Sequence, residues 1–335
     1  MKRKSYYINP GNIKSFELIE EEIENPNDDE VQIEVKAIGL NFAEVFSCLG
    51  LYQKAPKHKF IPGLEYSGII TKVGNSVEGL SIGDRIMGVR LFGSYTTVLN
   101  VNYKYVTKIP DDWSFEDGAS YLVQGLTAYY GLVELGRIKK NEIVLINSAA
   151  GGVGIFANRI AKKFDCTTIG SVGNKDKVSL CEKEGYDHVI VRDKDFKDNV
   201  KKVLNGRDLN LVMESNGGKV FEDSLSLLPI TGRMMIYGYA YYMPKGNRIN
   251  YLTLIYKYLT RQKIDIQNIN NQSFHIFNLI YLMDNVDEMR EVLSNLNKLD
   301  LGKQIIGEVF SFEELPQAIL KFKEGKTVSK IVVRI

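Results

Sequence analysis

The chain has 335 residues, of which 44% are hydrophobic and 25% are charged, as in an ordinary soluble globular protein. This length favours two domains of typical size. Lysine and arginine outnumber aspartate and glutamate by only two, which speaks against a nucleic-acid partner, and no apolar run is long enough to predict stable insertion into a membrane.

Nothing near the amino terminus is typical of a secretory signal. Residues 1–15 begin with basic side chains and are then interrupted by polar residues, a proline and a glycine, so they lack an apolar core. The three cysteines, Cys48, Cys166 and Cys181, are scattered, as is typical of reduced thiols. We therefore expect a cytoplasmic protein whose cysteines serve as small hydrophobic residues.

The first 110 residues are typical of a β-rich domain. Val31–Ile38 alternates between apolar and polar residues, which indicates a half-buried strand. Tyr66–Val73 and Ser94–Val101 are further expected strands, separated by turns such as Ser81–Asp84. Many short strands with turns between them predict a barrel or sandwich.

Strands and helices alternate after Pro110. Ser114–Leu135 is expected to form one helix with Ser114 as its N-cap. The alternation that follows predicts a parallel, doubly wound sheet. The expected strands are Ile143–Asn147, Thr167–Val172, His188–Val191, Leu209–Glu214 and Arg233–Tyr237, and the expected helices are Val153–Phe164, Lys175–Glu184 and Phe196–Leu204.

The alternation stops near residue 265. Val286–Leu296 has the pattern of an amphipathic helix. Lys330–Ile335 is expected to be a strand that returns to the first domain.

A glycine-rich turn follows the first strand of the predicted parallel sheet. The strand, the turn and the next helix together form the context that a dinucleotide-binding motif requires. Gly151 would let the backbone approach a pyrophosphate, and Gly154 would let helix and strand pack closely. Ala149 stands where the first glycine of the usual motif would be, so a purely structural turn is the alternative. The predicted phosphate contacts are Ala150, Gly151, Gly152, Val153 and Gly154.

The second strand of this unit lacks the acidic residue that would bind the ribose 2′-hydroxyl of NAD. A hydroxyl and three cations stand nearby instead: Ser171, Lys175, Lys177 and Arg192. This set favours the 2′-phosphate of NADPH. The alternative is that these are ordinary surface cations.

Several short motifs together resemble the zinc-independent medium-chain dehydrogenase/reductase superfamily, and quinone oxidoreductases in particular. They occur over nearly the whole chain, at Gly39–Val45, Gly50–Tyr52, Pro62–Gly68, Gly83–Ile86, Gly125–Tyr130 and Ala149–Gly154. Two later segments are similar to the branch that contains the vesicle amine transport protein, namely Ser273–Leu279 and Phe312–Ala318.

The resemblance implies an α/β protein in which a GroES-like β-rich catalytic domain surrounds an inserted Rossmann domain with a doubly wound parallel sheet. The catalytic domain would comprise residues 1–122 and 267–335, and the NADPH-binding domain residues 123–266. The cofactor would lie in the cleft between them. The resemblance places further cofactor contacts at Asn41, Thr127, Asn216, Tyr237, Gly238, Phe277 and Lys330.

The resemblance also implies an enzyme without a metal. Zinc-dependent relatives carry ligands at the positions of Asn41, Leu64 and Gln124, and these three residues do not make a usual zinc site. The stretch Val89–Pro110 contains no cysteine, so the structural zinc lobe of those relatives is absent too.

Without a Lewis acid, the enzyme lacks the group that would polarise an ordinary carbonyl for hydride transfer. A quinone or an α,β-unsaturated carbonyl spreads the developing negative charge and needs only hydrogen-bond donors. Family position makes Tyr52 and Asn41 the candidate catalytic residues, with Tyr52 donating to the enolate oxygen. The alternatives are that Tyr52 only lines the cleft and that Asn41 orients the nicotinamide ribose.

Two rival functions are compatible with parts of the sequence. The emptied ligand positions disfavour a zinc-type alcohol dehydrogenase. A catalytically weak protein that binds lipid, a membrane or a partner is the second rival, because Tyr251–Lys263 mixes aromatic, aliphatic and basic residues as interfacial helices do. A helix packed over the cleft or against a subunit explains the same segment, and we prefer that interpretation.

We also expect a homodimer. The predicted strand at Arg233–Gly238 would be the last of the parallel sheet. In the resembling families this edge pairs across a two-fold axis, which covers its exposed backbone groups.

Overall fold

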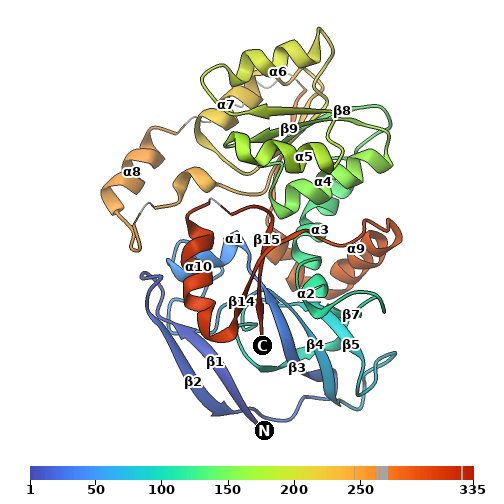
Figure 1. The fold of residues 1–335 in the computed structure, drawn as a ribbon, viewed down its shortest axis with the longest axis vertical. Helices are drawn as coiled ribbons and strands as arrows, with labels where there is room; N and C mark the ends of the chain where they lie inside the picture. Colours follow the sequence, from blue (N-terminus) through green and yellow to red (C-terminus); the bar gives the residue numbers. More distant parts are fainter. Residues whose placement is uncertain (245, 262–263, 265–270, 326) are drawn as a thin grey trace.

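The protein has two lobes, and both ends of the chain lie in the same one (Figure 1). The computed structural model describes residues 1–335 except 245, 262–263, 265–270 and 326. The lower lobe combines the amino-terminal strands with the carboxy-terminal segment, and the upper lobe contains the middle of the chain. The fold is therefore the predicted combination of a GroES-like domain with a parallel-sheet, Rossmann-like domain.

The lower lobe is built on a seven-stranded sheet with the order β14-β15-β3-β4-β5-β7, in which β6 also pairs with β3. Strand β15 runs antiparallel to β3, so the end of the chain returns to the first domain as predicted. An antiparallel pair, β1 and β2, stands beside this sheet. The strands are β1 (Lys2–Ile8), β2 (Phe16–Glu22), β3 (Glu30–Gly39), β4 (Glu65–Val73), β5 (Arg85–Val89), β6 (Val98–Asn102), β7 (Val106–Lys108), β14 (Ile306–Ser311) and β15 (Lys330–Arg334).

The upper lobe is a parallel sheet with the order β10-β9-β8-β11-β12-β13. The chain leaves β8 toward β10 and then crosses back to β11 on the other side, so a topological switch point lies beside β8. The strands are β8 (Ile143–Asn147), β9 (Thr167–Val172), β10 (His188–Val191), β11 (Leu211–Glu214), β12 (Arg233–Ile236) and β13 (Ser273–Ile276).

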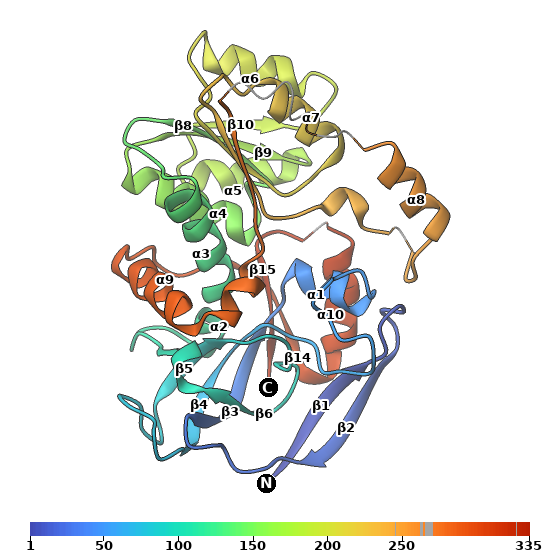
Figure 2. The same ribbon diagram turned by 180° about the vertical axis from the view of Figure 1, so that it is seen from behind.

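Helices cover both faces of this parallel sheet (Figure 2). In strand β8, Ile143 and Leu145 belong to one hydrophobic cluster, and Val144 and Ile146 belong to another. Because side chains alternate between the faces of a strand, one residue in two packs under each helix layer. The helices are α1 (Phe42–Cys48), α2 (Phe115–Gly118), α3 (Leu122–Tyr129), α4 (Gly152–Lys163), α5 (Val178–Lys183), α6 (Phe196–Leu204), α7 (Gly218–Ser226), α8 (Tyr251–Leu259), α9 (Val286–Lys298) and α10 (Leu315–Lys323), with shorter turns at Tyr103–Tyr105, Lys175–Lys177, Ala240–Tyr242, Leu279–Asp284 and Phe312–Glu314.

The helix predicted at Ser114–Leu135 is broken into three pieces. Ser114 does cap a helix, but α2 ends at Gly118, and α3 starts only at Leu122. The Oε1 atom of buried Glu65 accepts a hydrogen bond from the backbone N–H of Val123 at 3.0 Å. This long-range contact fixes the first turn of α3, which continues into a π-helical turn at residues 130–135.

Strand β13 corrects two expectations. It pairs parallel with β12, so the predicted last strand at Arg233–Gly238 is an inner strand and its backbone is not free to pair across a two-fold axis. The parallel sheet also includes Ser273–Ile276, which the sequence assigned to the catalytic domain. The predicted boundary between residues 266 and 267 itself lies outside the described residues.

The three cysteines and helix α8 were also singled out in the sequence. All three cysteines are buried and unpaired, as expected.

Helix α8 has no buried residue, and Leu252 is 81% exposed. Residues 262 and 263 of the predicted interfacial segment lie outside the described structure. None of the helices described has both the length and the apolar content needed to cross a bilayer.

Candidate functional site

A cleft of about 1560 Å³ lies between the two lobes and collects most of the predicted site residues. Typical small-molecule pockets measure roughly 300–1,000 Å³, so this cleft has room for more than one ligand. Among the described residues that line it, none is an aspartate or a glutamate. The cleft is therefore suited to ligands that are anionic or apolar.

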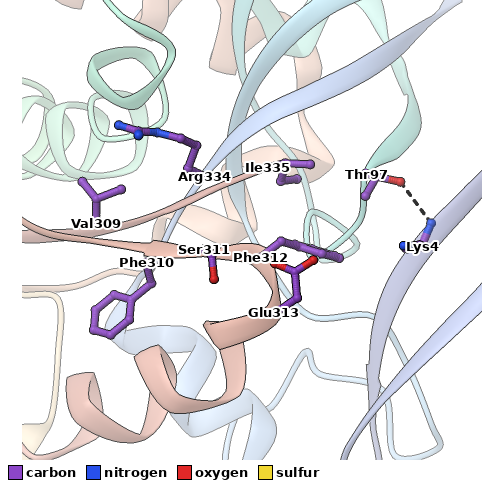
Figure 3. Close-up of a pocket in the computed structure, with 9 residues that line it drawn as sticks. All are labelled: Lys4, Thr97, Val309, Phe310, Ser311, Phe312, Glu313, Arg334 and Ile335. Atoms are coloured by element: carbon purple, nitrogen blue, oxygen red, sulfur yellow. Dashed lines mark hydrogen bonds between the residues drawn. The ribbon is translucent and has the colours of Figure 1, made fainter.

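A second hollow, of about 560 Å³, lies in the lower lobe and shares no lining residue with the cleft. It is formed at β14 and β15, and charged side chains such as Lys4, Glu313 and Arg334 line it (Figure 3). It contains none of the predicted site residues, so the cleft is the candidate functional site.

The glycine-rich turn brings the start of α4 to the cleft. Ser148 leaves β8 with a left-handed backbone (φ 59°), and Gly151 then caps α4. A Cβ atom on Gly154 would lie 2.5 Å from the carbonyl oxygen of Ala149, so only glycine permits this close packing of helix on strand. The turn lines the cleft from Ala150 to Gly154, and the free N–H groups of a twelve-residue helix suit an anion there.

Two cations lie together beside this turn. Lys177 donates to the carbonyl oxygens of Thr327 at 3.0 Å and Gly325 at 3.3 Å. Arg192 donates to the Oδ1 atom of Asn216 at 3.3 Å. Burial lowers the pKa of Lys177, and the neighbouring Arg192 lowers it further. Neither cation donates to a carboxylate among the described residues, which makes the pair a suitable site for a phosphate.

Two predicted cofactor contacts take other places. Ser171 is buried, and its hydroxyl donates to the Oδ1 atom of Asn147 at 2.5 Å. The same hydroxyl oxygen accepts a hydrogen bond from the guanidinium of Arg192 at 3.4 Å. Ser171 therefore supports Arg192 instead of lining the cleft. Lys175 is exposed and does not line the cleft either. The other predicted contacts do line it, namely Asn41, Thr127, Asn216, Tyr237, Gly238, Phe277 and Lys330.

Asn41 is held in one orientation by buried partners. Its Nδ2 atom donates to the carboxylates of Glu44 at 3.2 Å and Glu65 at 3.4 Å. Its Oδ1 atom accepts from Gln124 at 2.6 Å and Lys330 at 3.0 Å. Since carboxylates only accept and an ammonium only donates, the amide of Asn41 cannot be turned around.

Lys330 forms an ion pair with Glu65 at 2.7 Å in the floor of the cleft. The two side chains are 2% and 0% exposed. Burial raises the pKa of Glu65, and the ammonium beside it acts in the opposite sense. Lys330 therefore holds Asn41 and Glu65 in place, a role that the sequence did not predict.

Gln124 is a candidate site residue that the sequence singled out only as a zinc position, without a binding role. Its Nε2 atom donates to Asn41, and this leaves its Oε1 atom buried without a partner among the described groups. The side chain also packs on Gly152, where a Cβ atom would come within 2.6 Å of its Cγ atom. An unpaired buried acceptor beside the glycine-rich turn fits a ligand that carries hydroxyl or amide donors, as a dinucleotide does.

Tyr52 lines the cleft from the lower lobe. Its hydroxyl donates to the Oδ1 atom of Asn278 at 2.6 Å, and its ring packs edge-on against Phe92. Burial raises the pKa of Tyr52 above its ordinary value, so the phenol keeps its proton at neutral pH. To donate to a ligand oxygen, the hydroxyl must turn away from Asn278.

Two family profiles match the two lobes. Residues 27–111 match the profile described as "Alcohol dehydrogenase GroES-like domain", and residues 152–280 match "Zinc-binding dehydrogenase". The chain is 36% identical to a quinone oxidoreductase of Salmonella typhimurium over 217 residues, which are 64% of this chain and 66% of that protein. The chain belongs to the medium-chain dehydrogenase/reductase superfamily.

Other members of the superfamily match along nearly the whole chain. The synaptic vesicle membrane protein VAT-1 homolog of Danio rerio is 28% identical over 310 residues, which are 91% of this chain but only 64% of that protein. The quinone oxidoreductase of Escherichia coli in complex with NADPH superposes over the full length of both chains with a TM-score of 0.84 and 26% identity. The CurK enoyl reductase superposes with the same score and identity, over 99% of each chain.

The three positions at which the sequence resemblance places the zinc ligands of zinc-dependent relatives hold Asn41, Leu64 and Gln124. Leu64 is a buried apolar residue, and the two amides are hydrogen-bonded to each other. No group of three histidine, cysteine, aspartate or glutamate side chains within the described part of the chain could hold a metal ion. The donor set at this point is therefore unlike a zinc site.

The ion pair beneath Asn41 yields a prediction about stability. Lys330→Met keeps a long apolar stem but leaves Glu65 buried without its cation. We expect chemical denaturation to show a loss of about 3–5 kcal/mol in the free energy of unfolding. The double variant Lys330→Met/Glu65→Gln should recover a large part of this loss, because it buries no unpaired charge. Equal losses in both variants would contradict the electrostatic explanation.

Proposed function

We propose that the protein is an NADPH-dependent oxidoreductase that reduces a quinone or an α,β-unsaturated carbonyl without a metal ion. One observation carries this proposal. The glycine-rich turn at Ala150–Gly154 and the cations Lys177 and Arg192 line the same cleft as the amides of Asn41 and Gln124, which stand where zinc-dependent relatives are expected to have metal ligands. Both the NADPH complex of the Escherichia coli quinone oxidoreductase and the CurK enoyl reductase, whose folds superpose on this chain, support it.

The residues of the cleft would divide the binding of NADPH between them. The N–H groups at the start of α4 would hold the pyrophosphate, and Lys177 and Arg192 the 2′-phosphate. The Oε1 atom of Gln124 would accept a hydrogen bond from the cofactor. When bound, the reduced nicotinamide supplies a hydride.

Tyr52 and Asn41 would have different tasks. The hydroxyl of Tyr52 would stabilise the oxygen on which negative charge develops, and this hydroxyl or solvent would supply the proton that completes the reduction. Asn41 uses both ends of its amide on buried partners. It is therefore better suited to hold Gln124 and Lys330 in position than to act on the substrate.

The first prediction from this proposal concerns Tyr52. Losing one preorganised oxyanion donor costs about 2.7–4 kcal/mol, and a looser contact costs less. We expect Tyr52→Phe to lower kcat by roughly ten- to a thousandfold, with NADPH affinity nearly unchanged, as measured by steady-state kinetics and calorimetry.

The raised pKa of Tyr52 also predicts a pH dependence. The neutral phenol should persist as a donor, so kcat should not fall through ionisation of Tyr52 until the pH exceeds the ordinary phenol value of about 10.

Two outcomes would contradict this mechanism. Normal turnover by Tyr52→Phe on every accepted substrate would make Tyr52 only a lining residue. Activity should also survive dialysis against a chelator. If activity is lost on dialysis and zinc restores it, the metal-free proposal is wrong.

The second prediction concerns cofactor choice. A charge-assisted hydrogen bond contributes roughly 1.5–3 kcal/mol, which is on the order of ten- to a hundredfold in affinity. Lys177→Ala combined with Arg192→Ala should therefore weaken NADPH far more than NADH in calorimetric titrations. The lost contacts of Lys177 to Gly325 and Thr327 affect both cofactors equally, so the ratio is the readout. Lys175→Ala is the matched control, and an unchanged ratio in the double variant would refute the assignment.

The third prediction concerns assembly. With β12 inside the sheet, we infer that a homodimer forms through β13. The N–H of Ser273 donates to the carbonyl oxygen of Gly232, just before β12, and that of Phe277 donates to Ile236 in β12. By alternation, the N–H groups of Phe274 and Ile276 point outward. Ile276 is 66% exposed, and Ile276→Pro removes one outward donor. Light scattering should show a dimer for the native chain at micromolar concentration and a monomer for the variant. A native monomer would contradict the inference.

Binding at a lipid surface is a second candidate function, favoured by the exposure of α8. Tyr251, Leu252, Tyr256 and Leu259 are all at least 66% exposed. Leu254 and Tyr258 of the same helix line the cleft, which supports the preferred interpretation of a helix beside the cleft. Flotation with anionic liposomes, without turnover of NADPH on a panel of quinones and enones, would favour lipid binding over reduction.

A further inference from the structure

Helix α1 has two apolar faces, and only one of them packs into the core. Val45 and Cys48 are fully buried in the main hydrophobic core. Phe42 and Phe46, which are four residues apart and therefore share a face, are half-buried and line the cleft. In the described structure, neither ring is among the side chains that pack directly on the core. Two phenylalanines thus face the cleft.

A third ring joins them from α10. Phe42 packs edge-to-face against Phe46 at 5.8 Å and against Phe322 at 5.9 Å between ring centres. All three line the cleft, and α1 and α10 lie side by side in both views (Figures 1 and 2). We call Phe42, Phe46 and Phe322 the aromatic wall.

The aromatic wall begins next to the site of the proposed chemistry. Asn41 is the N-cap of α1, so Phe42 directly follows the residue that touches Gln124 and Lys330. Tyr52 follows the end of the same helix by four positions and lines the same cleft. A substrate whose oxygen meets Tyr52 can therefore extend a substituent along the wall.

The wall suits an uncharged, apolar substituent. Aromatic rings contribute no hydrogen-bond donor here, and the described lining of the cleft contains no carboxylate that could attract a cationic group. Apolar surface gains free energy in proportion to the area removed from water, so a chain of methylene groups is the ligand that such a wall favours. Six cations are among the described residues that line the cleft, and under the proposed function the cofactor occupies two of them, Lys177 and Arg192. The other four already have partners within the protein: Lys54 pairs with Asp284, Lys219 with Asp223 and Lys330 with Glu65, and Arg261 lies over the ring of Tyr258.

We propose that the aromatic wall binds the hydrocarbon tail of the substrate, and that the substrate class is conjugated carbonyl compounds with a long alkyl chain. This rests on the proposed reductase function. The hydride of NADPH adds to the β-carbon and a proton adds to the α-carbon, so the C=C bond becomes a single bond and NADPH becomes NADP⁺. The tail itself is unchanged and contributes only binding energy.

The test uses alkyl vinyl ketones from the methyl to the nonyl member. Each methylene that leaves water is worth up to about fourfold, so kcat/KM of the native enzyme should rise about two- to fourfold per added methylene. The rise should be largely lost in Phe46→Ala and in Phe42→Ala. Leu252→Ala is the matched control, because Leu252 is exposed and does not line the cleft, and it should keep the native rise. Unchanged NADPH affinity shows that each variant is folded.

The two proposals fail in different ways. Turnover of the methyl ketone without any dependence on chain length would overturn the tail site and leave the reductase function intact. If no ketone is turned over, the saturated alkyl ethyl ketones decide the matter in calorimetric titrations with NADP⁺ present. Their affinity should rise with chain length for the native protein and not for Phe46→Ala. Equal affinities along this series would overturn the tail site regardless of activity.

Discussion

The buried ion pair between Lys330 and Glu65 is the interaction on which the site depends. Lys330 begins β15, the last strand of the chain, and Glu65 begins β4. Glu65 also caps the first turn of α3, which leads into the upper lobe, and both residues bond to Asn41. One pair of opposite charges therefore joins the end of the chain, the first domain and the connecting helix. Burying such a pair costs desolvation free energy, and separating the two charges inside the protein costs more, because each would be left buried without a partner. This favours a single arrangement of these elements.

The same arrangement bears on the positions at which the sequence resemblance expects zinc ligands in zinc-dependent relatives, two of which are the amides Asn41 and Gln124. The ammonium of Lys330 already places a positive charge at Asn41, 3.0 Å from its Oδ1 atom. A dication at the same point would be repelled by it, and Leu64 offers no ligand. The local charge is thus balanced by Glu65 without a metal, and Gln124 is left with a free acceptor for a ligand.

Much of the parallel sheet could be predicted because its strands are buried on both faces and therefore form continuous apolar runs. Residues 143–147 and 167–172 are strands with the predicted bounds. Strand β13 was missed because Ser273–Ile276 is short and partly exposed, without such a run. The break in the helix after Gly118 and the ion pair of Lys330 were missed for another reason. Both depend on Glu65, which is 58 and 265 positions away from its partners and forms no local pattern.

The two walls of the cleft differ in their chemistry. The upper lobe supplies the helix N-terminus, Lys177 and Arg192, all of which attract anions. The lower lobe supplies the rings of α1 and α10, which attract apolar groups. An anionic cofactor and an apolar substrate would therefore each be drawn to its own side. The reactive ends of the cofactor and the substrate would meet where the two walls join. There the hydroxyl of Tyr52, in the lower lobe, donates a hydrogen bond to Asn278, which follows strand β13 of the upper lobe. A hydroxyl that is partly buried at this junction can stabilise charge on oxygen better than one in bulk solvent.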